Sequence, residues 1–213
     1  DHATIIRGPH EEGRFKQPDP VQIVAELCHI VNRNQQSKHF VVTLGANRAP
    51  IDSVRAIQNA SSGRTGWAIA EYLYRFGHQV TAIAGKTSAS PSFILPNTVR
   101  AGTPDDMLAA CLKVAKESPN PDGWVHSAAV LDYYAQPLDE KKPSGQDSWP
   151  IELKPGRKHI SELTEYIGNS RRIGFKLETG IELNELHKRA KEQLEKYGVD
   201  ATIANLLEEI NNE

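Results

Sequence analysis

A stretch rich in Gly, Ser, Asn and Arg, residues 43–66, has the residue types and spacing of an anion-binding site. Gly45 directly follows a short apolar run, and Ser61-Ser62-Gly63 stands before a segment with helical periodicity. The first amides of a helix have no partner within it, and the helix dipole favours negative charge there. Arg55 and Arg64 add positive charge suited to phosphate. The stretch predicts a phosphate site, with an ordinary capped helix as the plainer alternative; it is neither a P-loop nor a complete GxGxxG pattern.

Three further segments contain residues that could contact a nucleotide. Ala128 and Ala129 follow an apolar run and leave room for a flat ligand, and Asp132 could accept hydrogen bonds from a ribose or an amino group. Lys141 stands in an aperiodic stretch with Pro and Gly, where a mobile lysine could close over a phosphate. Phe175, near the end of another apolar run, could stack on a base. The plainer alternatives are a solvated Asp beside tight packing, a surface lysine and a core aromatic residue.

Alternating apolar strands and amphipathic helices must position these residues. Strands are predicted over residues 39–44, 79–84, 98–101, 124–127, 173–176 and 201–204, with helical periodicity between most of them. This order predicts an α/β fold: a doubly wound, mostly parallel, Rossmann-like sheet with helices on both faces. Ligands of such sheets bind outside the carboxyl ends of the strands, where the loops described above begin.

The predicted helices have clear ends and apolar faces. Asp19 and Pro20 begin the first helix, Thr103 caps a later one, and Gly77 and Gly198 end two others. One apolar face is expected in each of the first two helices: Val21, Val24, Leu27, Cys28 and Val31 in the first, and Ile69, Tyr72, Leu73 and Phe76 in the second. Cys28 and Cys111 are predicted to be buried free thiols in a reducing compartment.

Composition limits the classes of function. The chain has 213 residues and a formal net charge of −2, without a cluster of Lys and Arg. We therefore expect no nucleic-acid partner, and the apolar runs are too short for a membrane span. A cytoplasmic location is expected. Residues 1–19, polar and rich in Pro, Gly and His, are predicted to be an extended connector, and residues 20–213 a nucleotide-binding domain.

Several short motifs together resemble one enzyme family. They are Ile51-Asp52-Ser53-Val54-Arg55, Ile57-Gln58-Asn59, Ser61-Ser62-Gly63-Arg64-Thr65-Gly66, Ala128-Ala129-Val130-Leu131-Asp132-Tyr133, Phe175-Lys176-Leu177-Glu178-Thr179 and Ala204-Asn205. Their order and spacing, over roughly residues 12–207, resemble the phosphopantothenate–cysteine ligases, also called phosphopantothenoylcysteine synthetases. The connector resembles the linker that joins a flavin-dependent decarboxylase to the synthetase in bifunctional proteins. Relatives continue for another strand or two beyond Asn205, so a C-terminally truncated synthetase domain is expected.

The resemblance implies a ligase of coenzyme A biosynthesis, which joins 4′-phosphopantothenate to L-cysteine through an acyl-nucleotide at the expense of CTP or ATP. Mg²⁺ is expected on the triphosphate, with its protein ligands unknown. The resemblance also implies a homodimer and a fused or separate flavin-dependent decarboxylase. The implied catalytic residues are Asn59 and Lys141; those for the substrate are Arg55, Ser61, Ser62, Gly63 and Ala129; those for the nucleotide are Gly45, Ala128, Asp132 and Phe175.

The sequence departs from the family pattern at three places. The Gly-Gly-Thr turn of the family is Gly45-Ala46-Asn47 here, which adds a Cβ near the expected phosphates. Gln193 and Tyr197 stand where CTP-using relatives carry helix lysines, with Lys191 and Lys196 beside them. The Asn-Pro-Asp segment of those CTP-using relatives is replaced near Arg157-Lys158-His159. The absence of the helix lysines favours ATP slightly and leaves the choice of nucleotide open. A short-chain NAD(P)-dependent oxidoreductase and a non-catalytic nucleotide- or flavin-binding module are the alternative functions, although no Tyr-x-x-x-Lys pair stands where an oxidoreductase needs it.

Overall fold

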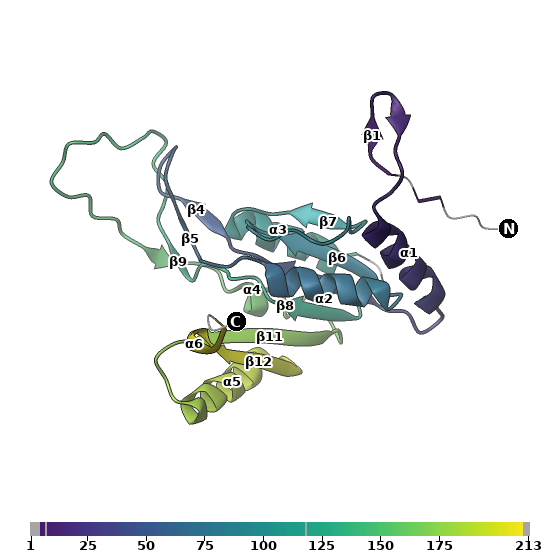
Figure 1. Cartoon of the computed structure of the whole chain (residues 1–213). Coiled ribbons are helices and arrows are strands. Elements are labelled where there is room, and N and C mark those ends of the chain that lie inside the picture. The colour runs from purple at the N-terminus through teal and green to yellow at the C-terminus, as the bar shows by residue number, and fades with distance from the viewer. Residues whose placement is uncertain (1–4, 7, 118, 211–213) are drawn as a thin grey trace.

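Six parallel strands form the central sheet in the order β12-β11-β8-β3-β6-β7 (Figure 1). This computed structural model describes residues 5, 6, 8–117 and 119–210. The strands are β3 (His39–Leu44), β6 (Gln79–Ala84), β7 (Thr98–Arg100), β8 (Gly123–His126), β11 (Arg171–Glu178) and β12 (Ala201–Leu206). Their apolar runs are typical of strands covered on both sides. The predicted fold class and all six predicted strands are confirmed; β11 and β12 extend further than predicted.

Helices cover both faces of this sheet. The first face carries α1 (Pro20–Asn32) and α2 (Arg64–Arg75), and the second carries α3 (Pro104–Ala115) and the segment after α4 (His159–Glu162). Alternate strand residues fill the two cores: Val42 and Leu44 pack with Trp67, and Val41 packs with Met107 on the opposite side. The helix α5 (Leu183–Tyr197) packs on β11 and β12, and α6 (Leu207–Ile210) follows β12.

Local signals fix the helix ends, as predicted. The Asp19 carboxylate accepts a hydrogen bond from the Val21 amide at 2.7 Å and begins α1. A reciprocal capping box between Thr103 and Asp106 begins α3. Gly198 ends α5 in the left-handed conformation with φ of 61°. Among the described residues, no helix has both the length and the apolar character needed to cross a membrane.

The predicted apolar face of α1 points to solvent, contrary to the expectation that it packs on the core. Val24 is 53% exposed, Leu27 52% and Val31 79%. The polar side of α1 faces the rest of the protein instead and hydrogen-bonds to it. Periodicity correctly located the stripe, but it contains no information about the side on which the domain lies.

Two related expectations also need correction. Tyr72 and Phe76 of α2 are 64% and 62% exposed, because α2 packs through Trp67 and Ala70 instead. Only one of the two thiols is buried: Cys111 lies in the core, where burial raises its pKa to about 12, whereas Cys28 is half-buried at the edge of α1.

Three segments expected to be irregular contain short antiparallel hairpins. Strands β1 (His10–Glu11) and β2 (Arg14–Phe15) pair within the connector, so it is not extended throughout; its residues 1–4 and 7 lie outside the described part. Their turn places Glu12 and Gly13 at φ of 50° and 76°. The other pairs are β4 (Arg48–Pro50) with β5 (Ala56–Gln58), and β9 (Tyr133–Tyr134) with β10 (Lys154–Pro155). The last two pairs and the loop between β9 and β10 extend away from the central sheet (Figure 1).

Candidate active site

The order of the strands along the chain reverses between β3 and β8, and the predicted residues Gly45, Asn59, Ala128 and Ala129 lie near that point. After β3 the chain crosses to β6 on one side, and it later returns to β8 on the other side. The residues that follow these two strands therefore lie beside each other: the Ala129 amide donates to Gly45 O at 2.8 Å, and Asn47 N donates to Ala129 O at 3.3 Å. Ligands of this fold class bind beside such a reversal, at the carboxyl ends of the strands, and we call this part of the protein the crevice.

Asn59 lies at this crevice and contacts Ala129, 70 positions further along the chain. Its Nδ2 donates a hydrogen bond to the Ala129 carbonyl oxygen at 3.1 Å. The structure thus brings together a predicted catalytic residue and a predicted substrate-binding residue. Asn59 is half-buried, and its Oδ1 makes no hydrogen bond with any residue that the structure describes. The side chain is held in place and keeps hydrogen-bonding capacity for a ligand.

The amino end of α2 provides unpaired backbone donors next to the same crevice. Gly63 caps the helix with φ of 80° and without a side-chain hydrogen bond, and Ser62 Oγ accepts a hydrogen bond from Arg64 N at 3.3 Å. The amides of Thr65 and Gly66 make no hydrogen bond within the described part of the chain. Two amides and the positive end of the helix dipole therefore face outward, as an anion site requires.

Gly66 allows α2 to approach β3 closely. A Cβ added at Gly66 would lie 2.3 Å from Leu44 Cβ and 2.7 Å from Ser127 Oγ, both closer than van der Waals contact. The Ser-Ser-Gly-x-x-Gly spacing is thus explained by packing as well as by ligand binding. Ala46 is completely buried, so the Cβ that departs from the family pattern is enclosed by protein.

A buried carboxylate holds the loop between β9 and β10, residues 135–153, which we call the flap. The Asp52 carboxylate accepts hydrogen bonds from the amides of Val54 and Arg55 at 2.8 and 2.6 Å, and from Lys142 N in the flap at 3.1 Å. Burial by itself raises the pKa of Asp52, but these three hydrogen bonds and the charge of Arg55 hold it at about 2. Asp52 is therefore ionised near neutral pH and ties the flap to the site loop.

Arg55, predicted to bind substrate, is directed toward the flap in this structure. Its guanidinium lies 2.8 Å from Asp52 Oδ2, donates to Lys142 O at 3.2 Å and stacks over the Trp149 ring at 5.0 Å. Lys141 precedes the anchored Lys142, is exposed, and has no hydrogen-bond or ion-pair partner among the described residues. The backbone of Lys142 is thus held in place, whereas the ammonium group of Lys141 is open to a ligand.

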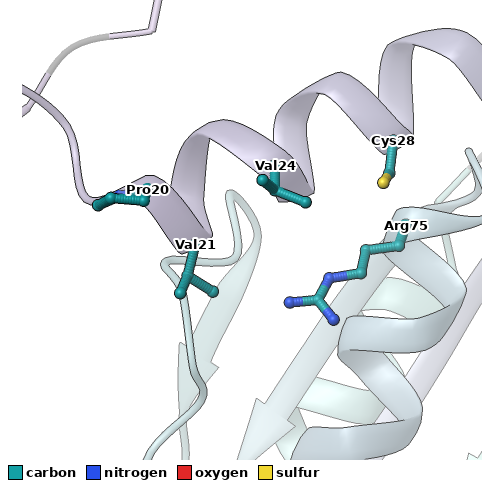
Figure 2. A pocket seen from close by; sticks show the side chains of 5 residues that line it. All are labelled: Pro20, Val21, Val24, Cys28 and Arg75. Atoms are coloured by element: carbon teal, nitrogen blue, oxygen red, sulfur yellow. The ribbon is translucent and has the colours of Figure 1, made fainter.

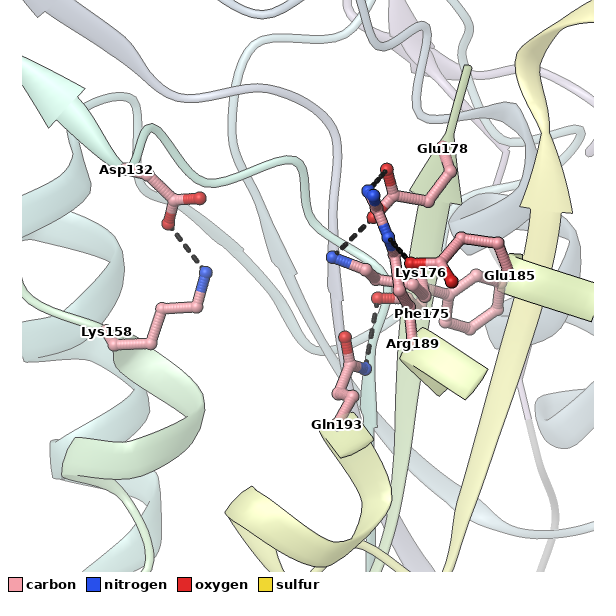
Figure 3. A network of polar contacts seen from close by, with 8 residues as sticks. All are labelled: Asp132, Lys158, Phe175, Lys176, Glu178, Glu185, Arg189 and Gln193. Carbon is pink, nitrogen blue, oxygen red and sulfur yellow. Dashed lines mark hydrogen bonds and ion pairs between the residues drawn. The ribbon is translucent and has the colours of Figure 1, made fainter. Parts of the chain in front are cut away.

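Asp132 lies at the edge of the site and is paired with Lys158, as Figure 3 shows. The two groups are 2.6 Å apart, with 58% and 48% of their side chains exposed. A pair this exposed contributes little to stability. A ligand could replace either partner at small cost, so Lys158 joins Asp132 as a candidate nucleotide contact.

A cluster of charged side chains lies at the carboxyl end of β11 (Figure 3). Glu178 is bound by Lys176 Nζ and Arg189 NH1, each at 2.8 Å. The hydrogen bond from Lys176 and then the charges of Lys176 and Arg189 lower the pKa of Glu178. Phe175 packs partly against the first core, and its carbonyl accepts from Gln193 Nε2 at 3.3 Å. Phe175 is thus partly a core residue, and its predicted stacking on a base stays a prediction.

Sequence reasoning missed several residues of this site. Arg189 and Lys158 have no motif of their own, and each meets its partner only through the fold. Asp52 stood in a quoted motif without a role, although the Asp-x-x-Arg spacing is a signal for a turn in which a carboxylate binds the amides that follow it. Trp149 lies in the aperiodic stretch, where nothing in the sequence indicates its contact with Arg55.

Two neutral histidines lie behind the crevice on the second face of the sheet. His126 ends β8, stacks on Trp124 at 6.0 Å, and its buried Nε2 has no hydrogen-bond partner in the described part. Burial, then the charges of Arg172 and His159, lower the pKa of His126 to about 3. Burial also lowers the pKa of His159 to about 4. Both side chains are therefore neutral packing groups at physiological pH.

The described residues contain no group of three or more His, Cys, Asp or Glu side chains that could hold a metal ion. A divalent cation carried on a triphosphate does not need such a group, because phosphate oxygens and waters can supply its ligands. That arrangement is common for Mg²⁺, which keeps several waters and is often bound through phosphates.

Comparison with known proteins decides the family. The model of the DNA/pantothenate metabolism flavoprotein C-terminal domain matches residues 35–212. The chain belongs to this family. The family resemblance drawn from the sequence motifs is thereby confirmed, and the matched range contains β3 to β12 with every predicted site residue.

Relatives of known name agree. The chain is 36% identical over 213 residues to the coenzyme A biosynthesis bifunctional protein CoaBC of Thermococcus kodakarensis, covering 99% of this chain and 52% of that protein. It is 29% identical over 197 residues to the protein of the same name in Bacillus subtilis, with coverage of 91% and 47%. The chain thus spans about half the length of these curated relatives.

Solved structures share the fold. The DNA/pantothenate metabolism flavoprotein of Streptococcus pneumoniae superposes with a TM-score of 0.71 at 27% identity, covering 80% of this chain and 83% of the other. The C-terminal domain of the coenzyme A biosynthesis bifunctional protein CoaBC superposes with a TM-score of 0.67 at 29% identity, covering 80% and 78%. The family domain that begins at residue 35 therefore corresponds to the C-terminal part of such proteins.

Proposed function

We propose that this domain is a phosphopantothenate–cysteine ligase of coenzyme A biosynthesis. One observation carries the proposal: Asn59 is fixed on Ala129 at the reversal of strand order, beside the open amino end of α2. Relatives named for coenzyme A biosynthesis support it. The crevice combines an amide side chain, unpaired backbone donors and several cationic groups, which suits reactions that develop negative charge on oxygen.

The reaction has two steps in this proposal. The carboxylate of 4′-phosphopantothenate attacks the α-phosphorus of the nucleoside triphosphate, and pyrophosphate leaves. The amine of L-cysteine then attacks the acyl carbon of the acyl-nucleotide, and the nucleoside monophosphate leaves. Asn59 donates to the oxygen that gains charge in these steps, and Lys141 approaches the phosphates from the flap.

The remaining site residues bind the two phosphate-bearing substrates. Ser61, Ser62, Gly63 and Arg55 contact phosphopantothenate together with Ala129, and Gly45, Ala128, Asp132 and Phe175 contact the nucleotide. Mg²⁺ is carried on the triphosphate. We further propose that the enzyme is a cytoplasmic homodimer and that it works with a fused or separate flavin-dependent decarboxylase.

We propose ATP rather than CTP as the preferred nucleotide. The amide of Gln193 is engaged with the Phe175 carbonyl, so it does not supply the positive charge of the lysine found in CTP-using relatives. The neighbouring lysines do not replace it: Lys191 is 78% exposed and lies 3.9 Å from Glu195, and Lys196 lies over the Tyr197 ring at 5.4 Å. A site that lacks specific partners for cytosine cannot favour CTP strongly over another nucleotide.

The proposal is tested by pyrophosphate release with 4′-phosphopantothenate, L-cysteine and Mg²⁺, using ATP and CTP separately at matched low concentration. Release over many turnovers is expected to require both 4′-phosphopantothenate and L-cysteine, and to be faster with ATP. A CTP preference above about tenfold, or 1.4 kcal/mol, would refute the nucleotide assignment. Hydride transfer from NAD(P)H without pyrophosphate release would favour an oxidoreductase instead, and nucleotide binding with neither reaction would favour a non-catalytic module.

A further inference from the structure

The outward face of α1 carries a row of exposed apolar side chains. We call it the α1 stripe; its members are between 40% and 79% exposed and comprise Val21, Val24, Leu27, Ile30 and Val31. A soluble helix normally turns such a stripe toward its own core. Contiguous apolar side chains left in water mark interaction sites more often than scattered single ones do.

Polar contacts fix α1 in this orientation. Tyr74 Oη donates to Glu26 Oε2 at 2.9 Å, and His29 Nδ1 lies 2.8 Å from the Tyr74 carbonyl oxygen with the two rings stacked at 4.1 Å. Asn32 Nδ2 donates to Arg75 O at 2.8 Å. Rotating the helix to bury the stripe would break all of these hydrogen bonds. The stripe is therefore held outward by the fold.

The stripe borders a hollow of about 370 Å³ between α1 and α2, lined by Pro20, Val21, Val24, Cys28 and Arg75 (Figure 2). Arg75 reaches under α1 from α2, and its guanidinium lies over the Phe93 ring at 5.1 Å. Its buried Nε has no hydrogen-bond partner in the part of the chain described. An apolar recess beside an incompletely paired guanidinium suits a protein surface that presents an apolar side chain next to a carboxylate.

The position of α1 in the chain indicates the occupant. Residues 20–32 precede residue 35, where the matched C-terminal domain begins, and the relatives are about twice as long as this chain. The alignment with the Thermococcus kodakarensis protein covers 99% of this chain, so it includes α1. The stripe thus stands at the junction between this domain and the half that precedes it in bifunctional relatives.

We propose that the α1 stripe and its hollow dock the flavin-dependent decarboxylase domain that precedes this domain in such proteins, whether on the same chain or as a separate one. This rests on the partner named under the proposed function, but not on ligase activity. A single helix face is in keeping with interfaces between domains of one chain, which are small and partly polar. Docking there would place the decarboxylase on the first face of the sheet, beside α1 and α2.

Cys28 reports on this docking, because it lines the hollow and is half-buried, whereas Cys111 is inaccessible in the core. The probe is a fused chain in which the N-terminal half of the Thermococcus kodakarensis protein precedes residue 1. Alkylation of Cys28 by iodoacetamide, followed by peptide mass spectrometry, is expected to be about tenfold slower in the fused chain than in this chain alone, as when roughly nine-tenths of the molecules are docked. Alkylation of Cys111, which is buried in the core, reports any unfolding of the fused chain or of this chain alone.

Leu27→Glu in the fused chain should restore the Cys28 rate of the separate domain, because Leu27 belongs to the stripe but does not line the hollow with Arg75, so the new carboxylate would be buried without a partner. Phe76→Glu is the matched control: Phe76 is 62% exposed on α2, outside the stripe, and its change should leave protection intact. Equal Cys28 rates with and without the added half would overturn the proposal, as would protection that grows with the concentration of this chain alone, which identifies a second copy as the occupant. Pyrophosphate release measured on the same proteins separates failure of docking from failure of the proposed ligase function.

Discussion

Replacing Asn59 by Asp should stop turnover and leave the fold intact. The substitution keeps the size of the side chain but removes the Nδ2 donor that lies 3.1 Å from the Ala129 carbonyl oxygen. Two acceptors then face each other, and because Asn59 is half-buried, water can relieve part of the conflict. We expect a loss in the free energy of unfolding of about 1 kcal/mol, at the lower end of the range for a lost partner. The catalytic cost is larger: removing one donor to a developing oxyanion lowers kcat about 100- to 1000-fold.

The two effects are measured separately, by pyrophosphate release and by thermal unfolding. About 1 kcal/mol corresponds to a decrease in Tm of roughly 2–4 °C for a domain of this size. Asn97→Asp is the matched control, since Asn97 is exposed just before β7, the edge strand, and lies away from the proposed site. Activity of the Asn59 variant within about tenfold of the unchanged protein would refute the role given to this amide. A large decrease in Tm would show instead that Asn59 is mainly structural.

Three further predictions follow from the geometry. Gly66→Ala should lower the free energy of unfolding by about 1–3 kcal/mol in urea titrations, because its Cβ would overlap Leu44; an unchanged midpoint would contradict this. The pKa values of His126 and His159, about 3 and about 4 in the folded protein, lie below the ordinary 6.5, so the unfolded chain binds protons more readily. The contribution of these two neutral histidines to the free energy of unfolding should therefore be complete above about pH 6.5 and decrease below it. Equal urea midpoints at about pH 7.5 and pH 5 would exclude this. Asp52→Asn should speed amide exchange over residues 138–148, since a donor would then face Lys142 N; unchanged exchange would show that Asp52 does not hold the flap.

Sequence reasoning succeeded where a signal is local. The runs that became β3 and β6 are continuous and apolar, and strands buried on both faces have this pattern. Thr103 and Asp106 form their capping box within four residues, so the start of α3 was readable without the fold. The alternation of strands and helices indicated that ligands bind at the carboxyl ends of the strands, and the Asn59 segment and Ala129 meet there.

Sequence reasoning failed where a contact depends on distant residues. Asp52 and Lys142 are 90 positions apart, and nothing near either residue indicates the other. The direction of the α1 stripe is a similar case, because periodicity defines a face of a helix but not its neighbour. The roles of Lys141 and Phe175 stay predictions, since each depends on a ligand.

The pairing of β3 with β8 has a consequence for the order in which the protein assembles. Ser127 Oγ donates to Thr43 O across 84 positions of sequence, whereas β3 and β6 are joined by a shorter connection that contains the β4–β5 hairpin and α2. Closing the longer loop costs more chain entropy, and non-local pairings form slowly. The unit of β3, α2 and β6 can form early, but Asn59 has no Ala129 to bind until the segment around residues 123–129 arrives. The contact between Asn59 and Ala129 is therefore expected to form late in folding, when two separately formed parts of the sheet meet.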